Sequence, residues 1–143
     1  MSARRYVETS ALLRALLEED RELRAALGGE GLFTSALTLV EATRSVHRAR
    51  REGRLDAATA REVERQLASF ERACDVIDLD DEVLRMARDE LPAEPVRTLD
   101  ALHLASVRVL DAALGSFEIL SCDERVRRNA VALGFRVLPA RSS

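Results

Sequence analysis

The sequence predicts an α/β fold of three layers, in which a short parallel sheet of four to five strands is flanked by helices on both faces. Short apolar runs alternate along the chain with longer segments of helical period, as expected for parallel strands joined by crossover helices. Such strands are short and apolar because the sheet is covered on both sides. With 143 residues, 47% of them hydrophobic, the chain has enough apolar surface for one core. We therefore expect a single domain over residues 1–143.

The first half of the chain is expected to contain two strands and four helices. In chain order these are a strand at 5–8, a helix beginning at 9–10, a second short helix, a strand at 32–33, a helix from 34–35 to about 52, and a helix from Asp56 to Cys74. Glycines near residue 30 and at Gly53 separate these elements. The last two helices should form an antiparallel pair.

The second half is expected to contain three strands and three helices. In chain order these are a strand at 76–79, a helix from 80–81 to 91, a helix at 97–110, a strand at 117–120, a helix from 123 to 134, and a strand at 135–138. Pro92 and Pro95 mark the loop before the helix at 97–110, and a short unstructured tail is expected from Pro139. Ligands of parallel sheets gather at the carboxyl ends of the strands.

The helix predicted at 97–110 is apolar around most of its circumference, yet Asp100 lies in its first turn. Such a helix belongs in the middle of a domain, where an unpaired carboxylate is costly to bury. Two interpretations remain open at this point. Either Thr98 and Asp100 open and cap the helix, or Asp100 stays charged because a cation is held beside it.

The composition excludes several classes of protein. All 22 basic residues are arginine and the net charge is -3, which argues against general coating of nucleic acid but permits an acidic centre walled by arginine. The two cysteines, Cys74 and Cys122, show no spacing of a zinc site or disulfide framework. One Tyr, four Phe and no Trp offer few platforms for stacking bases. No apolar run approaches a membrane span and no secretory signal is recognisable, so we expect a cytoplasmic protein without a membrane partner.

Four acids stand out as candidate ligands for a metal ion. Glu8, Asp100 and Asp123 lie where strands give way to helices, and Glu41 lies inside a helix at the border of its apolar face. Four converging carboxylates repel one another unless cations are bound. Oxygen ligands without clustered Cys or His suit one or two Mg²⁺ or Mn²⁺ ions, which can promote phosphodiester cleavage. The alternative is that each acid merely caps a helix or offsets its dipole.

Other polar residues near these acids have two interpretations each. Arg44, Arg48 and Arg51 continue the helical stripe of Glu41, and Arg125 follows Asp123. These arginines either bind an RNA backbone or form a solvated face paired with acids such as Glu52. Thr9, Ser10 and Thr98 either hold metal-bound water or cap helices. His103 lies one turn from Asp100, and we expect a satisfied core residue rather than a general base.

Four segments taken together resemble the successive motifs of PIN-domain proteins, in particular the VapC-type toxins of bacterial toxin-antitoxin pairs: YVETSALLRALLE, TSALTLVEATRSVHR, RTLDALHLA and LSCDERVRRNAVALGFRVL. The resemblance covers nearly the whole chain. It implies a PIN-like fold and a Mg²⁺- or Mn²⁺-dependent endoribonuclease that cleaves RNA phosphodiester bonds as a toxin. It also implies a homodimer inhibited by a small antitoxin.

The resemblance assigns the acids of the family site to Glu8, Glu41, Asp100 and Asp123, and its hydroxyl beside the last acid to Ser121. The first acid of the family is usually Asp, so Glu8 is longer by one methylene, and Mg²⁺ is strict about octahedral geometry. From the sequence alone we expect Glu8→Asp to leave activity unchanged or to raise it. The alternatives to a toxin are a catalytically weak PIN-like module that binds RNA or protein, and a nuclease of RNA maturation.

The helix expected from Asp56 to Cys74 carries an apolar stripe of Val63, Leu67, Phe70 and Cys74. A groove beside this stripe is expected to accept an amphipathic helix of the antitoxin. The alternatives are that the stripe packs against the first helix of the chain or forms a homodimer contact.

Overall fold

A five-stranded parallel sheet forms the middle of the protein, whose computed structural model describes residues 3–140. The strand order is β3-β2-β1-β4-β5, and every neighbouring pair is parallel. The strands are β1 (Arg4–Val7), β2 (Leu32–Ser35), β3 (Asp75–Ile77), β4 (Phe117–Leu120) and β5 (Arg136–Leu138). The central strand β1 is therefore the first in the chain, and successive strands are added on either side of it.

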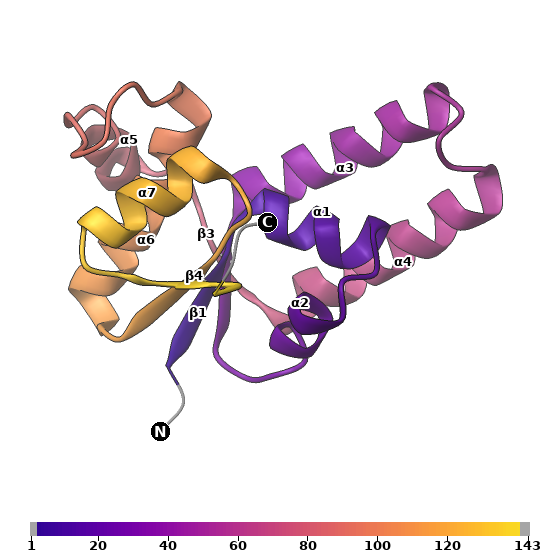
Figure 1. Cartoon of the computed structure of the whole chain (residues 1–143), viewed down its shortest axis with the longest axis horizontal. Helices are drawn as coiled ribbons and strands as arrows, with labels where there is room; N and C mark the ends of the chain where they lie inside the picture. The colour runs from indigo at the N-terminus through magenta and orange to yellow at the C-terminus, as the bar shows by residue number, and fades with distance from the viewer. Residues whose placement is uncertain (1–2, 141–143) are drawn as a thin grey trace.

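Helices cover both faces of the sheet, which confirms the predicted three layers (Figure 1). One face carries α1 (Thr9–Leu17), α2 (Arg21–Ala26), α3 (Ala36–Arg51) and α4 (Ala57–Ala73). The other carries α5 (Asp81–Met86), α6 (Thr98–Leu114) and α7 (Glu124–Ala132). The helices α3 and α4 pack together as the expected antiparallel pair and extend beyond the sheet (Figure 1).

The core is divided between the two faces by the alternation of side chains along the strands. Val7 and Leu120 pair in register and point into the cluster under α1 and α4, whereas Tyr6 and Ile119 point into the cluster under α6 and α7. All four are almost fully buried. Burial of each large apolar side chain contributes about 1.5–3 kcal/mol to the free energy of folding, so the packing on both faces of the sheet stabilises the fold.

Acidic and hydroxyl side chains begin most of the helices. Ser35 caps α3, Asp56 caps α4 and Asp80 caps α5, and in each case the side-chain oxygen accepts a backbone N–H of the first turn. The helix α6 is different, because its N-cap residue is Arg97 and no side chain caps it. Of the two interpretations left open for Thr98, capping of this helix is therefore wrong.

Several element boundaries differ from those predicted, most of them by one or two residues, and three differ for a visible reason. The helix α5 ends at Met86 instead of Leu91, because the backbone N–H groups of Arg88 and Asp89 donate three residues back, to Arg85 and Met86, and that of Leu91 donates to Glu94 in the loop. The helix α6 continues to Leu114 and ends where Gly115 adopts a positive φ of 74°. The strand β3 spans only 75–77, because its partner β2 ends at Ser35, where α3 begins.

Most of the apolar stripe of α4 is part of the core, and a surface hollow of about 290 Å³, lined by Phe70 of that stripe together with Leu16 and Leu27, remains beside it. Leu67 and Phe70 are buried in the cluster that includes Leu12 of α1, and Val63 is buried against Val46 of α3. The alternative interpretation, packing against the first helix, is the one observed. A charge at Leu67 would therefore disrupt the fold rather than an interface.

None of the helices within residues 3–140 is long and apolar enough to cross a membrane. The tail expected from Pro139 lies mostly outside the described part of the chain.

Candidate functional site

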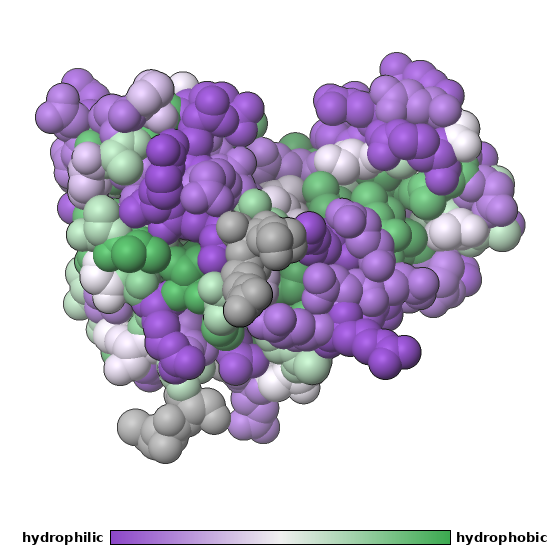
Figure 2. Space-filling view, viewed as in Figure 1, coloured by the Kyte–Doolittle hydropathy of each residue, from purple (hydrophilic) through white to green (hydrophobic). Residues whose placement is uncertain are grey.

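Two of the candidate acids, Glu8 and Asp123, follow the carboxyl ends of β1 and β4, where the strand order reverses direction along the chain, and Glu41 and Asp100 reach the site from α3 and α6. Glu8 follows β1 directly, and its backbone N–H donates to the carbonyl of Leu120 at the end of β4. Sheets of this type bind their ligands at such a switch point. Figure 2 shows a notch on this side of the molecule, between the lobe of α5 to α7 and the projecting end of α3.

Glu8 is held by hydroxyl groups from both strand ends. Its Oε1 accepts the hydroxyls of Ser10 and Ser121, each at 2.5 Å, and its Oε2 accepts the backbone N–H of Ser10 at 3.0 Å. Glu8 is thus the N-cap of α1, and it is buried. The Ser10 hydroxyl also accepts the backbone N–H of Cys122, which ties the two loops together. The carboxylate therefore has a fixed position, with three donors directed at it.

Asp100 and Asp123 share one guanidinium group. Arg97 Nε lies 3.3 Å from Asp100 Oδ2, and Arg97 Nη2 lies 3.5 Å from Asp123 Oδ2. Asp123 also caps α7 by accepting two backbone N–H groups, and its own N–H donates to the Ser121 hydroxyl at 3.1 Å. Ser121 thus links Glu8 to Asp123. Asp100 is only 6% exposed although it is an acid in the first turn of an apolar helix.

Glu41 approaches from α3 and accepts two hydrogen bonds on one oxygen. The Thr9 hydroxyl donates to Glu41 Oε1 at 2.6 Å, and His103 Nε2 lies 2.7 Å from the same atom. The other ring nitrogen, His103 Nδ1, lies 2.8 Å from the hydroxyl of Tyr6. Because a carboxylate only accepts, a neutral His103 must carry its proton on Nε2 and accept the Tyr6 hydroxyl at Nδ1.

The pKa of Glu41 is set by opposing effects. Burial alone raises this pKa, but the hydrogen bonds from His103 and Thr9, followed by the charges of His103 and Arg97, outweigh burial and lower it below its ordinary value of 4.5. Burial strongly raises the pKa of the Tyr6 hydroxyl, so it stays protonated as a donor. Glu41 is therefore a carboxylate at neutral pH.

Comparison with known proteins identifies the family. The model of the PIN domain matches residues 5–132. The chain belongs to the PIN-domain family. It is 30% identical over 145 residues to Ribonuclease VapC35 of Mycobacterium tuberculosis, a match that covers 93% of this chain and 94% of that protein.

Two solved structures share the fold of this PIN domain. The DNA-bound VapBC of Salmonella typhimurium superposes with a TM-score of 0.66 at 15% identity, covering 95% of this chain and 97% of that one. A toxin-antitoxin complex of Klebsiella pneumoniae superposes with a TM-score of 0.64 at 16% identity, covering 99% and 100% of the two chains. The PIN-like three-layer fold that the four motifs predicted is thereby confirmed.

Three of the four acids of this PIN domain, Glu8, Asp123 and Asp100, form one network, but the acids do not form a preformed metal cluster. Glu8 connects through Ser121 to Asp123, and Arg97 joins Asp123 to Asp100. Within residues 3–140, no three carboxylate, imidazole or thiol groups stand close enough together to hold a metal ion as they are. The donor set is nevertheless all oxygen, and two of its acids already share a cationic group, so hard divalent ions fit its chemistry.

The hydroxyl residues predicted near the acids differ in what they contact. Thr9 donates to Glu41, and both Ser10 and Ser121 donate to Glu8. Thr98 is exposed and makes no side-chain hydrogen bond within the described part of the chain. The first three are thus brought to the acids, whereas Thr98 is not.

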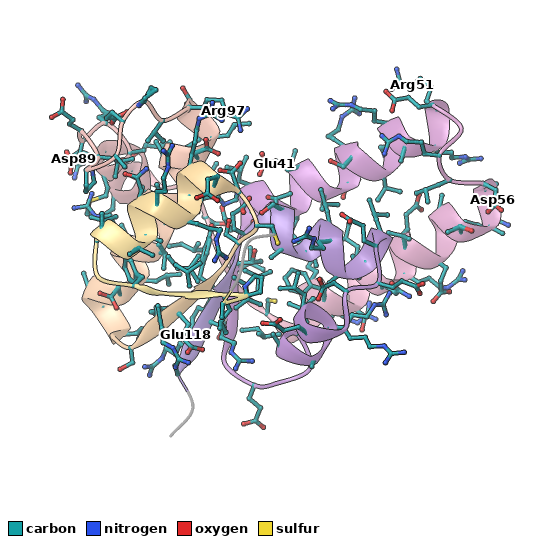
Figure 3. The ribbon with its side chains drawn as sticks, in the orientation of Figure 1. Glu41, Arg51, Asp56, Asp89, Arg97 and Glu118 are labelled. Carbon is teal, nitrogen blue, oxygen red and sulfur yellow. The ribbon has the colours of Figure 1, made fainter. Side chains whose placement is uncertain are left out.

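The predicted arginine track lies along the exposed side of α3. Arg44, Arg48 and Arg51 line a surface hollow of about 300 Å³ together with Glu52, and Arg51 lies near the projecting end of the helix (Figure 3). Within residues 3–140 none of the three forms an ion pair, because Glu52 is engaged by Arg54 at 2.8 Å. Arg125, in the first turn of α7, is also exposed. Pairing of Arg44, Arg48 or Arg51 with Glu52, the alternative considered from the sequence, is therefore not observed.

Glu118 is a buried acid outside the candidate site, and its two ion pairs give it a structural role. Glu118 is bound by Arg5 at 3.2 Å and by Arg136 at 3.0 Å, and it lies at the opposite end of the molecule from Glu41 and Arg97 (Figure 3). Both of its oxygens are neutralised by cations of the chain itself. The acids near the notch have fewer such partners.

Sequence reasoning missed two residues of the site. Arg97 lies three positions before Asp100, a spacing that allows contact on one helix face and was an available signal. His103 was expected to be a satisfied core residue, and at 2% exposure it is one. Its partner, however, is the candidate acid Glu41, which lies 62 positions earlier in the chain.

Proposed function

We propose that this PIN domain is a divalent-metal-dependent endoribonuclease that cleaves RNA phosphodiester bonds as the toxin of a toxin-antitoxin pair. The observation that carries the proposal is the acidic network at the switch point of the sheet, in which Asp100 and Asp123 must share the guanidinium of Arg97. Acids arranged in this way require a cation. The name of its relative in Mycobacterium tuberculosis, a ribonuclease, supports RNA as the substrate.

The residues that would hold Mg²⁺ or Mn²⁺ are Glu8, Glu41, Asp100 and Asp123. When bound, such an ion stabilises charge on the phosphate and lowers the pKa of a water molecule, which makes that water a nucleophile at neutral pH. The protein supplies negative oxygen ligands in fixed places. Ser10 and Ser121 fix Glu8, and Thr9 and His103 fix Glu41.

The substrate backbone would be bound by the unpaired arginines around the notch. Guanidinium groups contact phosphate oxygens through two parallel hydrogen bonds and carry no base preference. Those we assign to this role are Arg44, Arg48, Arg51 and Arg125. Their placement on α3 and α7 would lead an RNA strand past the acids between the two helices.

The partners proposed for the protein follow from its relatives. The solved structures of similar fold are described as a VapBC assembly and a toxin-antitoxin complex, which supports a small antitoxin as the inhibitor of this chain. We also propose that the chain forms a homodimer and acts in the cytoplasm. The hollow beside Phe70 on α4 is the place we propose for an amphipathic helix of that antitoxin.

A second candidate function is a catalytically weak module that binds RNA. The observation that favours it is the separation of the acids, no three of which stand at ligand distance in the described residues. In this case RNA would bind to the arginines without being cut. A nuclease of RNA maturation would differ from a toxin in having no inhibitory partner.

The test is cleavage of total RNA by the purified protein in Mg²⁺, in Mn²⁺ and in EDTA, with and without a small protein encoded beside its gene. The proposal expects cleavage in at least one metal, none in EDTA, and inhibition by the small protein. Binding of RNA without cleavage in either metal supports the weak module instead. Cleavage that no neighbouring protein inhibits supports a maturation nuclease.

A further inference from the structure

Arg97 occupies an unusual position among the residues of the site. It is the N-cap of α6, the one helix within residues 3–140 whose N-cap side chain accepts no backbone N–H of the first turn. A cation is disfavoured there, because the start of a helix carries partial positive charge. The contacts with Asp100 at 3.3 Å and Asp123 at 3.5 Å offset this disadvantage.

The guanidinium of Arg97 stands where the positive charge of the site is needed. It contacts two of the four acids, and its charge contributes to the lowered pKa of a third, Glu41. The oxygens it touches, Asp100 Oδ2 and Asp123 Oδ2, are also oxygens that a divalent ion would require. A guanidinium and a metal ion on the same oxygens would repel each other strongly.

Little holds Arg97 in place apart from these two contacts. Its side chain is 66% exposed, and exposed ion pairs are individually weak. In Figure 3 it lies on the same side of the molecule as Glu41, across the notch from the end of α3 that carries Arg51. A guanidinium released from the acids would remain tethered at the mouth of the site, facing the proposed path of the RNA.

We propose that Arg97 is the internal counterion of the acidic site, that it leaves Asp100 and Asp123 when the divalent ion binds, and that it then binds the RNA phosphate at the scissile bond. The inference rests on the proposed function and adds a phosphate-binding residue to it. A planar guanidinium suits this second role, because it offers two parallel donors to phosphate oxygens. One side chain thus neutralises the acids before the substrate arrives and the phosphate afterwards.

The first arm of the test measures binding of Mn²⁺ alone to the metal-free protein by titration calorimetry. Arg97→Gln should bind Mn²⁺ about fivefold more tightly than the wild type, since the competing cation is gone. Arg128→Gln is the matched control, because it removes the same charge from an exposed position of α7 that has no ion pair in the described residues. Its Mn²⁺ affinity should stay within about twofold of the wild type.

The second arm measures kcat/KM on a short RNA at Mn²⁺ concentrations that saturate each variant. Arg97→Gln should be about tenfold slower or worse, and Arg97→Lys should recover part of the loss, since it restores the charge without the bidentate geometry. Thermal unfolding without metal should show all variants folded. Tighter metal binding together with slower cleavage in Arg97→Gln supports both roles of Arg97.

Two results separate failure of this inference from failure of the proposed function. If the wild type binds Mn²⁺ and cleaves RNA while Arg97→Gln behaves like Arg128→Gln in both arms, the role of Arg97 is overturned and the function stands. If Arg97→Gln binds Mn²⁺ more tightly but cleaves as fast as the wild type, the phosphate role is overturned. If the wild type binds no Mn²⁺ and cleaves nothing, the proposed function itself fails.

Discussion

Replacing His103 by two different amides tests whether this buried residue acts through Glu41. His103 presents Nε2 to Glu41 at 2.7 Å and Nδ1 to the Tyr6 hydroxyl at 2.8 Å. In His103→Gln the terminal amide reaches the place of Nε2, so it can still donate to Glu41. In His103→Asn the shorter amide remains near the place of Nδ1, so it keeps Tyr6 and loses Glu41. Each variant therefore keeps one of the two contacts, and only His103→Asn loses the contact with Glu41.

The size of the effect follows from the nature of that contact. A hydrogen bond to a charged group contributes about 1.5–3 kcal/mol. Because the Glu41 side chain is 24% exposed, the lower end of this range applies, and a loss of about 1.4 kcal/mol corresponds to about tenfold. Loss of such orienting partners typically lowers metal affinity or activity about 10–100-fold. We expect Asn to lower both about tenfold and Gln to lower them about threefold or less.

The assay is Mn²⁺ titration calorimetry together with kcat/KM on one short RNA, with thermal unfolding as the control for folding. Both substitutions leave space in the core, so similar losses of unfolding temperature are expected and do not distinguish the variants. Equal losses of Mn²⁺ affinity in the two variants, or no loss in either, would refute the idea that His103 positions Glu41.

Three further predictions concern the acids and the arginine track. Glu8→Asp shortens a side chain whose carboxylate accepts three hydrogen bonds. We therefore predict, contrary to the expectation from sequence, about tenfold slower cleavage in Mg²⁺ and a smaller loss in Mn²⁺. Equal or faster cleavage in Mg²⁺ would contradict this prediction. The pKa of Glu41 is lowered in the folded state, so its contribution to stability is complete above pH 4.5 and is lost as the pH falls through the folded-state pKa. Urea unfolding of the metal-free protein should therefore show a weaker loss of stability below pH 4.5 in Glu41→Gln than in the wild type. An unchanged pH profile would show that the hydrogen bonds from His103 and Thr9 to Glu41 contribute nothing to stability. The triple variant in which glutamine replaces Arg44, Arg48 and Arg51 should bind RNA more weakly. The slope of the logarithm of the RNA association constant against the logarithm of salt concentration should fall by about two. An unchanged slope would show that these arginines do not contact the RNA.

The placement of the acids was predictable because it depends on chain order and sheet geometry. Glu8 and Asp123 follow parallel strands, so any fold that pairs β1 with β4 brings them to the same edge. Both are also helix caps, so the capping interpretation and the site interpretation hold together for these two residues. Glu41 was identifiable from its position at the border of the apolar face of α3.

The contacts of long side chains and the partners of buried faces were not predictable. The reach of Arg97 to Asp123 depends on the angle between α6 and α7, which periodicity does not encode. The apolar stripe of α4 showed that Leu67 must be covered, but not that Leu12 of α1 covers it instead of another chain. The early end of α5 depends on local hydrogen bonds of Arg88, Asp89 and Leu91, contacts with no sequence signature.

The most direct test of the central claim is Mn²⁺-dependent cleavage of one RNA by the wild type, Asp100→Asn and Asp111→Asn. The two acids lie on the same helix, but Asp100 is in the acidic network whereas Asp111 is near the other end of α6 and has no side-chain ion pair in the described residues. If the acidic network holds the metal ion, Asp100→Asn abolishes cleavage while it remains folded, and Asp111→Asn cleaves like the wild type. Undiminished cleavage by folded Asp100→Asn would contradict that role of the network.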